Sequence, residues 1–303
     1  MPGTGIGLRG RLAGAPISWG VCEIPNWGYA LPAPRVLREM ASLELRGTEL
    51  GPAGFLPADP EAVRALLQKH HLCVVGGFVF LVLHEASLAG ASLATAAAAA
   101  HRVAAAGGEV LVTAAATGSP DLSGRPELNG RHWRHLLAML GQVDAIAEGH
   151  GLCQAFHPHA GTVVETAADV RRVLDGSTVA LCFDTGHLAI GGTDSLALAR
   201  EAADRIGHVH LKDVNPHLAA RLRSGATSFQ KAVQHGLFPP LGGGSIPVKQ
   251  VVAALEGAGY RGWYVLEQDT ALTADPTDLE RPMADAQASL DYLREAARTP
   301  NSS

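Results

Sequence analysis

The sequence has few cysteines and no excess of basic charge. Four cysteines are spread over 303 residues without a close pair: Cys22, Cys73, Cys153 and Cys182. Each lies in or beside an apolar run, which indicates free thiols in a reducing cytosol. Lysine and arginine total 24 against 29 acidic residues, so the formal net charge is −5 and no basic surface for nucleic acid is indicated. We therefore expect a cytoplasmic protein that binds no nucleic acid.

Long uninterrupted hydrophobic runs are also absent. The longest alanine-rich stretch, 94–106, is interrupted by His101 and Arg102 and is followed by two glycines, whereas a membrane-spanning helix needs about 20 apolar residues. The first residues lack the apolar centre of a signal peptide. Hydrophobic residues still make up 47% of the chain, enough for a sizeable core. We expect no membrane partner.

What the chain does contain is a repeated alternation of strand and helix patterns. The predicted strands are 15–21, 45–51, 72–78, 109–117, 153–159, 180–184, 207–213 and 262–269. Helical patterns lie between them, including one from Asp59, a predicted N-cap, to His70. Eight such alternations at this length predict an α/β fold, a single (β/α)8 TIM barrel over residues 1–303.

One connection is too long to be a simple turn. Residues 214–245 follow the seventh predicted strand and contain only one short helical pattern, 228–236. Barrel loops of this length usually cover the active site or contact another subunit. We expect a loop insertion that lies over the mouth of the barrel or against a partner subunit of a homo-oligomer.

Polar residues gather where the later strands end. They are Glu49, His157, His159, Asp184, His187, His208, His210, Lys212, Glu267 and Asp269. The carboxyl ends of barrel strands meet at one face, and alternation along the seventh strand puts His208, His210 and Lys212 on one side. A lone histidine is more often an ordinary hydrogen-bonded residue. Five histidines with carboxylates at neighbouring strand ends, without a thiolate, instead indicate a site for Mn²⁺, Co²⁺, Mg²⁺ or Zn²⁺.

Several motifs resemble a known superfamily. DTGH (184–187), HVHLKD (208–213) and VLEQD (265–269) resemble the late strand ends of xylose-isomerase-like barrels. SWGVCEIPNWGY (18–29), GTELGPAGFLP (47–57), VGGFVFLVLH (75–84) and HPHAGTVVET (157–166) resemble the inosose dehydratase family within it. The likeness extends from about Ala15 to Asp269. The late motifs are widespread in the superfamily, and the earlier ones discriminate better.

The resemblance implies a metal ion held by four residues in chain order. Asp184, His210 and Glu267 match the superfamily pattern, while His157 stands where many relatives have glutamate. Dehydratase-like members share this His-Pro-His form, so the resemblance still implies a metal, most often Mn²⁺ or Co²⁺. Glutathione is a further cofactor that the family resemblance allows. Losing one carboxylate disfavours an epimerase that needs two bases. Phe80 and Gly243 also depart from the family pattern and leave the exact substrate open.

The implied reaction is the dehydration of 2-keto-myo-inositol (inosose) or a related cyclic polyol ketone. It requires proton abstraction beside the carbonyl and loss of a β-hydroxyl group as water. The expected catalytic residues are Glu267, Lys212 and Glu49, with Glu49 or a histidine as the base if Glu267 binds the ion. Lys212 would stabilise the enolate or protonate the leaving group, unless it only forms a salt bridge to Asp213 or Glu267.

The substrate would be contacted by a second group of residues. An apolar platform of Trp19, Trp27 and Phe55 is one interpretation, and ordinary core aromatics are the other. The predicted substrate-binding set is Trp19, Trp27, His159, His187, His208 and Asp269.

Three other functions remain open from the sequence. A ketose epimerase or isomerase would use the same metal without eliminating water. An endonuclease IV-like repair enzyme needs more metal ligands and a basic groove, which the net charge opposes. A non-catalytic sugar-binding protein is disfavoured because Asp184, His210 and Glu267 are all retained.

Overall fold

The chain folds into a closed barrel of eight parallel strands, in the order β1 to β8 around the ring. The computed structural model describes residues 7–119, 124–273 and 281–296. The strands are β1 Leu12–Gly14, β2 Gly47–Glu49, β3 Cys73–Leu81, β4 Val110–Ala115, β5 Cys153–Phe156, β6 Ala180–Asp184, β7 Ile206–Leu211 and β8 Tyr264–Leu266. The predicted TIM barrel is confirmed.

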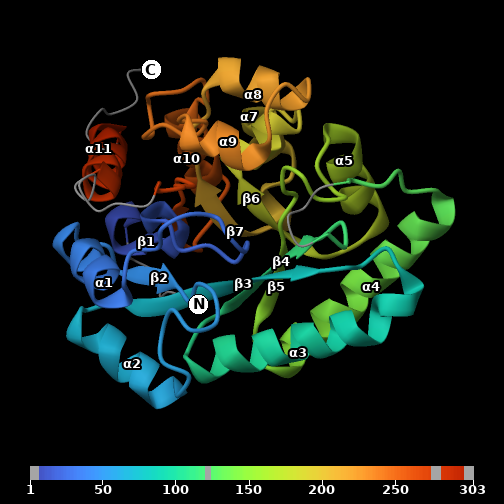
Figure 1. Cartoon of the computed structure of the whole chain (residues 1–303), viewed down its shortest axis with the longest axis horizontal. Coiled ribbons are helices and arrows are strands. Elements are labelled where there is room, and N and C mark those ends of the chain that lie inside the picture. Colours follow the sequence, from blue (N-terminus) through green and yellow to red (C-terminus); the bar gives the residue numbers. More distant parts are fainter. Residues whose placement is uncertain (1–6, 120–123, 274–280, 297–303) are drawn as a thin grey trace.

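Helices surround the strands, which lie at the centre of the molecule (Figure 1). They are α1 Ala33–Ser42, α2 Pro60–Lys69, α3 Ala89–Ala105, α4 Gly130–Gly149, α5 Ala167–Gly176, α6 Thr185–Ile190, α7 Ser195–Glu201, α8 Pro216–Arg223, α9 Phe229–Gln234, α10 Val248–Gly257 and α11 Arg281–Ala296. The predicted cap of α2 is confirmed, because the Asp59 side chain accepts hydrogen bonds from two amides of the first turn. None of the described helices has the length and apolar character needed to cross a membrane.

The first strand was predicted too late in the chain. β1 ends at Gly14, where it pairs with both β2 and β8 and so closes the barrel. Pro16 has no N–H for a ladder and instead starts a 3-10 helix, Pro16–Trp19. All of the predicted strand 15–21 therefore lies after β1, as a 3-10 helix and loop at the carboxyl end of the barrel.

Alternation along β7 separates the core from the site. Val209 and Leu211 pack into the large hydrophobic core between strands and helices. His208 and His210 both reach Glu49 at the end of β2, which is not a neighbour of β7 in the ring. Their side chains therefore extend across the inside of the barrel from one face of β7, and the shared face is what the sequence predicted.

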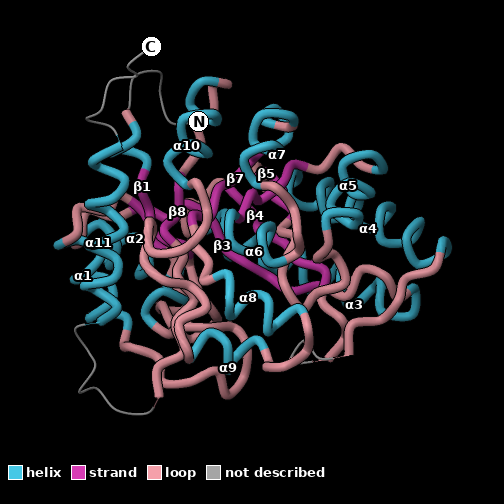
Figure 2. The backbone as a smooth tube through the Cα atoms, turned by 90° about the horizontal axis from the view of Figure 1, so that it is seen from above, coloured by secondary structure: helices cyan, strands magenta, loops and turns pink. Residues whose placement is uncertain are grey.

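The 214–245 segment contains two helices where the sequence predicted one. α9 was predicted but α8 was missed, although Leu218, Ala219 and Leu222 share one face of it and pack against the same apolar cluster. Its start is nevertheless encoded by the Asn215 cap and by Pro216 in the first turn. The two helices pack against each other (Figure 2).

Gly191 provides a test of the close packing between the end of α6 and the segment that precedes α5. It ends α6, and its carbonyl accepts a hydrogen bond from the Ala167 amide. A Cβ atom here would overlap the Glu165 carbonyl oxygen. Gly191→Ala should therefore lower the free energy of unfolding by about 1–3 kcal/mol, the usual cost of overpacking.

Gly141→Ala is the matched control. Gly141 lies exposed within α4, and a Cβ atom there would contact nothing. Alanine should raise the free energy of unfolding by about 0.5–1 kcal/mol, because it restricts the unfolded chain. Urea unfolding measures both; equal stability of the two variants would contradict the close approach at residue 191.

Candidate active site

Four predicted metal ligands converge at the carboxyl ends of β5 to β8. His157 Nε2 lies 3.2 Å from His210 Nδ1 and 3.4 Å from Asp184 Oδ2. His210 Nδ1 is 3.6 Å from Asp184 Oδ2 and 3.0 Å from Glu267 Oε2. All four side chains are buried. The structure therefore brings together the residues that the sequence assigned to one coordination sphere.

Asp184 has one engaged and one open carboxylate oxygen. Oδ1 caps α6 by accepting hydrogen bonds of 2.8 Å from the Gly186 and His187 amides. Oδ2 is buried and accepts no hydrogen bond among the described residues, although it faces His157, His210 and Lys212. The cap thus fixes the carboxylate with one oxygen turned toward the cluster.

Glu49 orients two of the histidines from the opposite side. His208 Nε2 and His210 Nε2 lie 3.0 and 2.9 Å from its Oε1. A carboxylate only accepts, so both Nε2 atoms carry protons, and neutral His210 would keep Nδ1 free to bind an ion. Burial raises the pKa of Glu49, but His210 and His208 outweigh it and hold the pKa below its ordinary value. Glu49 is therefore ionised at neutral pH.

Lys212 is the cation at the centre of the cluster. Its Nζ lies 2.6 Å from Glu267 Oε1, 2.9 Å from Asp269 Oδ1 and 3.1 Å from Asp184 Oδ2. The salt bridge to Glu267, which the sequence left as an alternative to a catalytic role, is present. The alternative partner, Asp213, instead accepts hydrogen bonds from four backbone amides: those of Val214, Gly242, Gly244 and Ile246. Lys212 is buried and does not line the pocket described below.

The charges around this point fit a divalent ion. Glu49, Asp184, Glu267 and Asp269 are buried carboxylates opposed by one ammonium group. With neutral histidines, three buried negative charges lack a cation, which is costly. Burial lowers the pKa of His210, but Cys182, Glu267 and Glu49 outweigh it and raise that pKa well above its ordinary value. Positive charge is thus drawn to the place where the ligand atoms converge.

Two other residues could replace members of the predicted ligand set. His187 also converges with His157, Asp184 and Glu267, but its Nδ1 accepts from the Ala160 amide and its Nε2 lies 2.9 Å from Lys212 Nζ. Cys182 converges with His157 and His210, yet burial raises the pKa of its thiol to about 12. Both are poorer ligands than His210, whose Nδ1 faces the ligand atoms of His157 and Glu267.

His159 and His187 form a stacked pair of neutral imidazoles next to the predicted metal ligands. His159 and His187 stack with ring centroids 3.7 Å apart. Burial, neighbouring histidines and Lys212 lower the pKa of each well below its ordinary value. Of this pair only His159 lines the pocket, where it meets Phe80 at a centroid distance of 5.8 Å. His187 supports it from behind.

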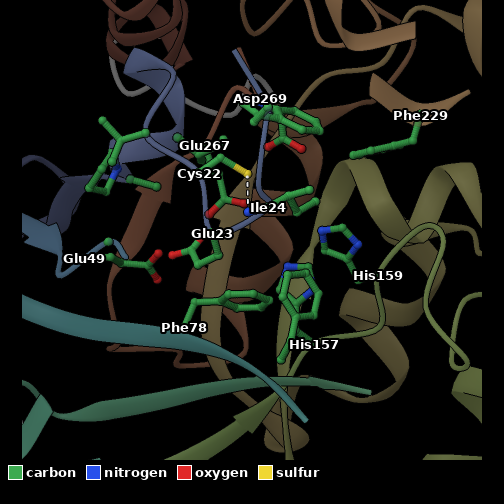
Figure 3. Close-up of a pocket in the computed structure, with 17 residues that line it drawn as sticks. Cys22, Glu23, Ile24, Glu49, Phe78, His157, His159, Phe229, Glu267 and Asp269 are labelled. Atoms are coloured by element: carbon green, nitrogen blue, oxygen red, sulfur yellow. Dashed lines mark hydrogen bonds between the residues drawn. The ribbon is translucent and has the colours of Figure 1, made fainter. Parts of the chain in front are cut away.

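A pocket adjoins the cluster (Figure 3). It is lined by Ala15, Pro16, Ile17, Val21, Cys22, Glu23, Ile24, Trp27, Glu49, Gly51, Phe78, Phe80, His157, His159, Phe229, Glu267 and Asp269. Its polar floor comes from strand ends, and its apolar walls come from β3, the loop after β1 and α9. Among the described residues, no lysine or arginine lines it.

The predicted aromatic platform is only partly present. Trp27 lines the pocket and donates its indole N–H to the Thr270 carbonyl at 2.9 Å. Trp19 lies in the large core with its indole bound to Glu39, and Phe55 packs against that core. His208 is buried beneath Glu49, whereas Asp269 does reach the pocket.

Sequence reasoning missed the walls of the pocket. Glu23, Phe78 and Phe229 line it without having been selected. Phe78 had a usable signal, because it alternates with Phe80 at the end of a strand. Glu23 and Phe229 lie in a loop and a short helix whose positions depend on tertiary contacts, so the sequence held no local signal for them.

Comparison with known proteins is consistent with this architecture. The model of the xylose isomerase-like TIM barrel family matches residues 37–296. The chain belongs to that family. Among solved structures of this barrel, the IolI protein, solved with a bound zinc atom, superposes with a TM-score of 0.71 at 14% identity. That match covers 95% of this chain and all of IolI, and it supports the fold.

Closer relatives within the xylose isomerase-like family come from sequence comparison. The rhizopine catabolism protein MocC of Rhizobium meliloti is 32% identical over 274 residues, covering 86% of this chain and 81% of MocC. An inosose dehydratase of Geobacillus kaustophilus is 32% identical over 275 residues, covering 86% of this chain and 89% of the relative. The resemblance to inosose dehydratases predicted from the motifs is confirmed.

Lys212→Met tests whether the cluster of buried carboxylates depends on the positive charge of Lys212 for its stability. Removing the ammonium group leaves its carboxylate partners buried and uncompensated. We expect the metal-free variant to lose about 3–5 kcal/mol of unfolding free energy. Lys249→Met, at a half-buried lysine 3.6 Å from exposed Glu295, should cost less than about 1 kcal/mol. Equal losses in urea unfolding with a chelator present would contradict the central role of Lys212.

Proposed function

We propose that this protein catalyses the metal-dependent dehydration of 2-keto-myo-inositol or a closely related cyclic polyol ketone. The observation that carries this proposal is the convergence of His157, Asp184, His210 and Glu267 beneath a pocket that also exposes Glu49. Similarity to inosose dehydratase over most of both chains supports the same reaction.

The pocket suits an uncharged ring. Its walls include Trp27, Phe78, Phe80 and Phe229, which offer flat apolar surfaces to the C–H face of a cyclitol. Carboxylates and imidazoles at the floor can accept hydrogen bonds from hydroxyl groups. Among the described residues the pocket offers no arginine or lysine to pair with a phosphate or carboxylate. These features favour a neutral polyol ketone.

A divalent ion would be held by His157, Asp184, His210 and Glu267. When bound, it would polarise the substrate carbonyl and lower the energy of the enolate. Mn²⁺ or Co²⁺ is our proposal for the metal, and glutathione stays a further cofactor that the family resemblance allows. The Glu49–His210 hydrogen bond would fix the imidazole with Nδ1 toward the ion, as carboxylates commonly do for metal-binding histidines.

Glu49 is our proposal for the base. It is ionised and lines the pocket, and both histidines contact the same oxygen, Oε1. Oε2 has no hydrogen bond from a described residue and can take the proton next to the substrate carbonyl. Lys212 lies below the pocket and holds Asp184, Glu267 and Asp269, which supports a positioning role rather than direct proton transfer.

Glu267→Gln tests metal binding and chemistry together. The amide weakens a metal ligand and breaks the 2.6 Å pair with Lys212. We expect loss of bound metal and a fall in dehydration of at least about a hundredfold. Metal content is measured by atomic emission, and product from 2-keto-myo-inositol by ultraviolet absorbance with added Mn²⁺ or Co²⁺.

Glu148→Gln is the control, because Glu148 is exposed on α4 and should keep both properties. If the metal-loaded wild-type protein gives no absorbance change but epimerises a ketose cleanly, the epimerase alternative replaces the proposal. Full metal content and activity in Glu267→Gln would contradict the assignment of that residue.

The 214–245 segment takes part in the same pocket. Phe229 of α9 lines it, and the Gln230 amide donates to the Asn26 and Trp27 carbonyls at 2.7 and 2.8 Å. This contact joins the segment to the loop after β1 across the mouth of the barrel. Its position supports a cover that excludes water from a reactive enolate.

Hydrogen exchange tests the cover. We expect 2-keto-myo-inositol to slow amide exchange in α9, because substrate packed against Phe229 should stabilise the closed arrangement. Helix α3, on the outside of the barrel, is the internal control and should be unaffected. Unchanged exchange in α9 at saturating substrate would refute the covering role.

A further inference from the structure

Glu23 enters the pocket from the loop after β1. It lines the pocket together with Glu49 and Glu267, and Figure 3 shows its side chain directed into the same space. The side chain is half-buried, and apolar residues, including Ile17 and Phe78, line the same pocket. A carboxyl group in this position would contact a bound ring.

The loop that carries this carboxyl group is held at several points. The Trp27 indole binds the Thr270 carbonyl at 2.9 Å, and Gln230 binds the Trp27 carbonyl at 2.8 Å. Within the loop, the Ile24 amide donates to Cys22 Sγ at 3.3 Å. A side chain on a clamped loop is positioned before substrate arrives, which catalysis requires.

The other acids of the pocket are already engaged. Histidines bind Glu49, and Lys212 binds Glu267 and Asp269. In the part of the chain that the structure describes, no side chain pairs with Glu23. Burial raises the pKa of Glu23 to about 8, and the negative charges of Glu49 and Glu267 act in the same direction. Glu23 is thus the acid of this pocket that has no side-chain partner among the described residues, and it lines the same space as Glu49, an arrangement that suits acid–base catalysis.

We propose that Glu23 donates the proton that turns the departing hydroxyl group into water. This role rests on the dehydration proposed above. After Glu49 removes the proton beside the carbonyl, the electron pair of the enolate forms a carbon–carbon double bond and the carbonyl re-forms. The β-carbon–oxygen bond breaks with its electrons on oxygen, which takes the proton of Glu23 and leaves as water. The proton held by Glu49 returns to Glu23 through solvent.

Deuterium exchange separates the two halves of this reaction. In D₂O, removal and return of the proton beside the carbonyl labels the unreacted ketone even when elimination is blocked. Glu23→Gln keeps the size of the side chain but has no acidic proton. It should slow dehydration by about 10²–10⁴-fold, the scale of one acid–base group, while still labelling the recovered 2-keto-myo-inositol. Glu49→Gln should lose both labelling and dehydration.

Three controls make the result specific. Metal content and melting temperature of each variant show whether the site and fold are intact. Glu148→Gln should behave as wild type. Glu23→Asp, a shorter acid at the same place, should recover part of the elimination and keeps the test valid if Glu23→Gln folds poorly.

Several outcomes would overturn the role of Glu23. If Glu23→Gln dehydrates the substrate at the wild-type rate, Glu23 is not the proton donor. A raised KM with unchanged kcat makes Glu23 a binding residue only, and loss of labelling with intact metal content places it in proton abstraction instead. If wild-type protein with Mn²⁺ or Co²⁺ does not dehydrate 2-keto-myo-inositol, the proposed function itself fails and the donor role fails with it.

Discussion

The concentration of buried negative charge at the carboxyl end of the barrel constrains the rest of the site. Among the described residues, Glu49, Asp184, Glu267 and Asp269 surround one buried ammonium group, that of Lys212, and Asp213 is buried nearby on backbone amides. Such charges can be buried only when each is paired or hydrogen-bonded. Three interactions meet this requirement together. Histidines bind Glu49, backbone amides at the start of α6 bind Asp184, and Lys212 pairs with Glu267. Metal-ligand geometry and stability are therefore properties of one connected cluster, so a substitution at one member acts on the others.

The sequence predicted this cluster because its signals are local. HVHLKD alternates polar and apolar residues, and the strand period alone puts His208, His210 and Lys212 on one side. Barrel geometry then brings the ends of distant strands together. Only two facts had to be correct: that the strands are parallel and that they close into a ring. Small errors in strand boundaries therefore did no harm, since the polar residues lie at the ends where the strands converge.

The elements that the sequence did not predict depend on contacts between distant residues. Trp19 resembles a platform residue by type, but its indole binds Glu39 of α1 and lies in the core. Glu23 resembles an ordinary loop residue, yet the loop is fixed by Gln230, about two hundred residues later in the chain. β1 was misplaced for a related reason, because the residues from Pro16 to Trp19 form a 3-10 helix and not a strand. Composition and periodicity carry no information about such pairs.

The floor and the walls of the pocket are therefore under different constraints. A change of charge in the floor disturbs several buried ion pairs at once, so the floor tolerates little variation. The walls consist of aromatic side chains and a loop glutamate that contact few buried charges. A change such as Phe80 in place of the proline expected from the resemblance alters the shape of the pocket and leaves the charge of the cluster intact. Substrate preference can thus diverge through β3, α9 and the loop after β1 while the metal-binding residues and the base stay in place.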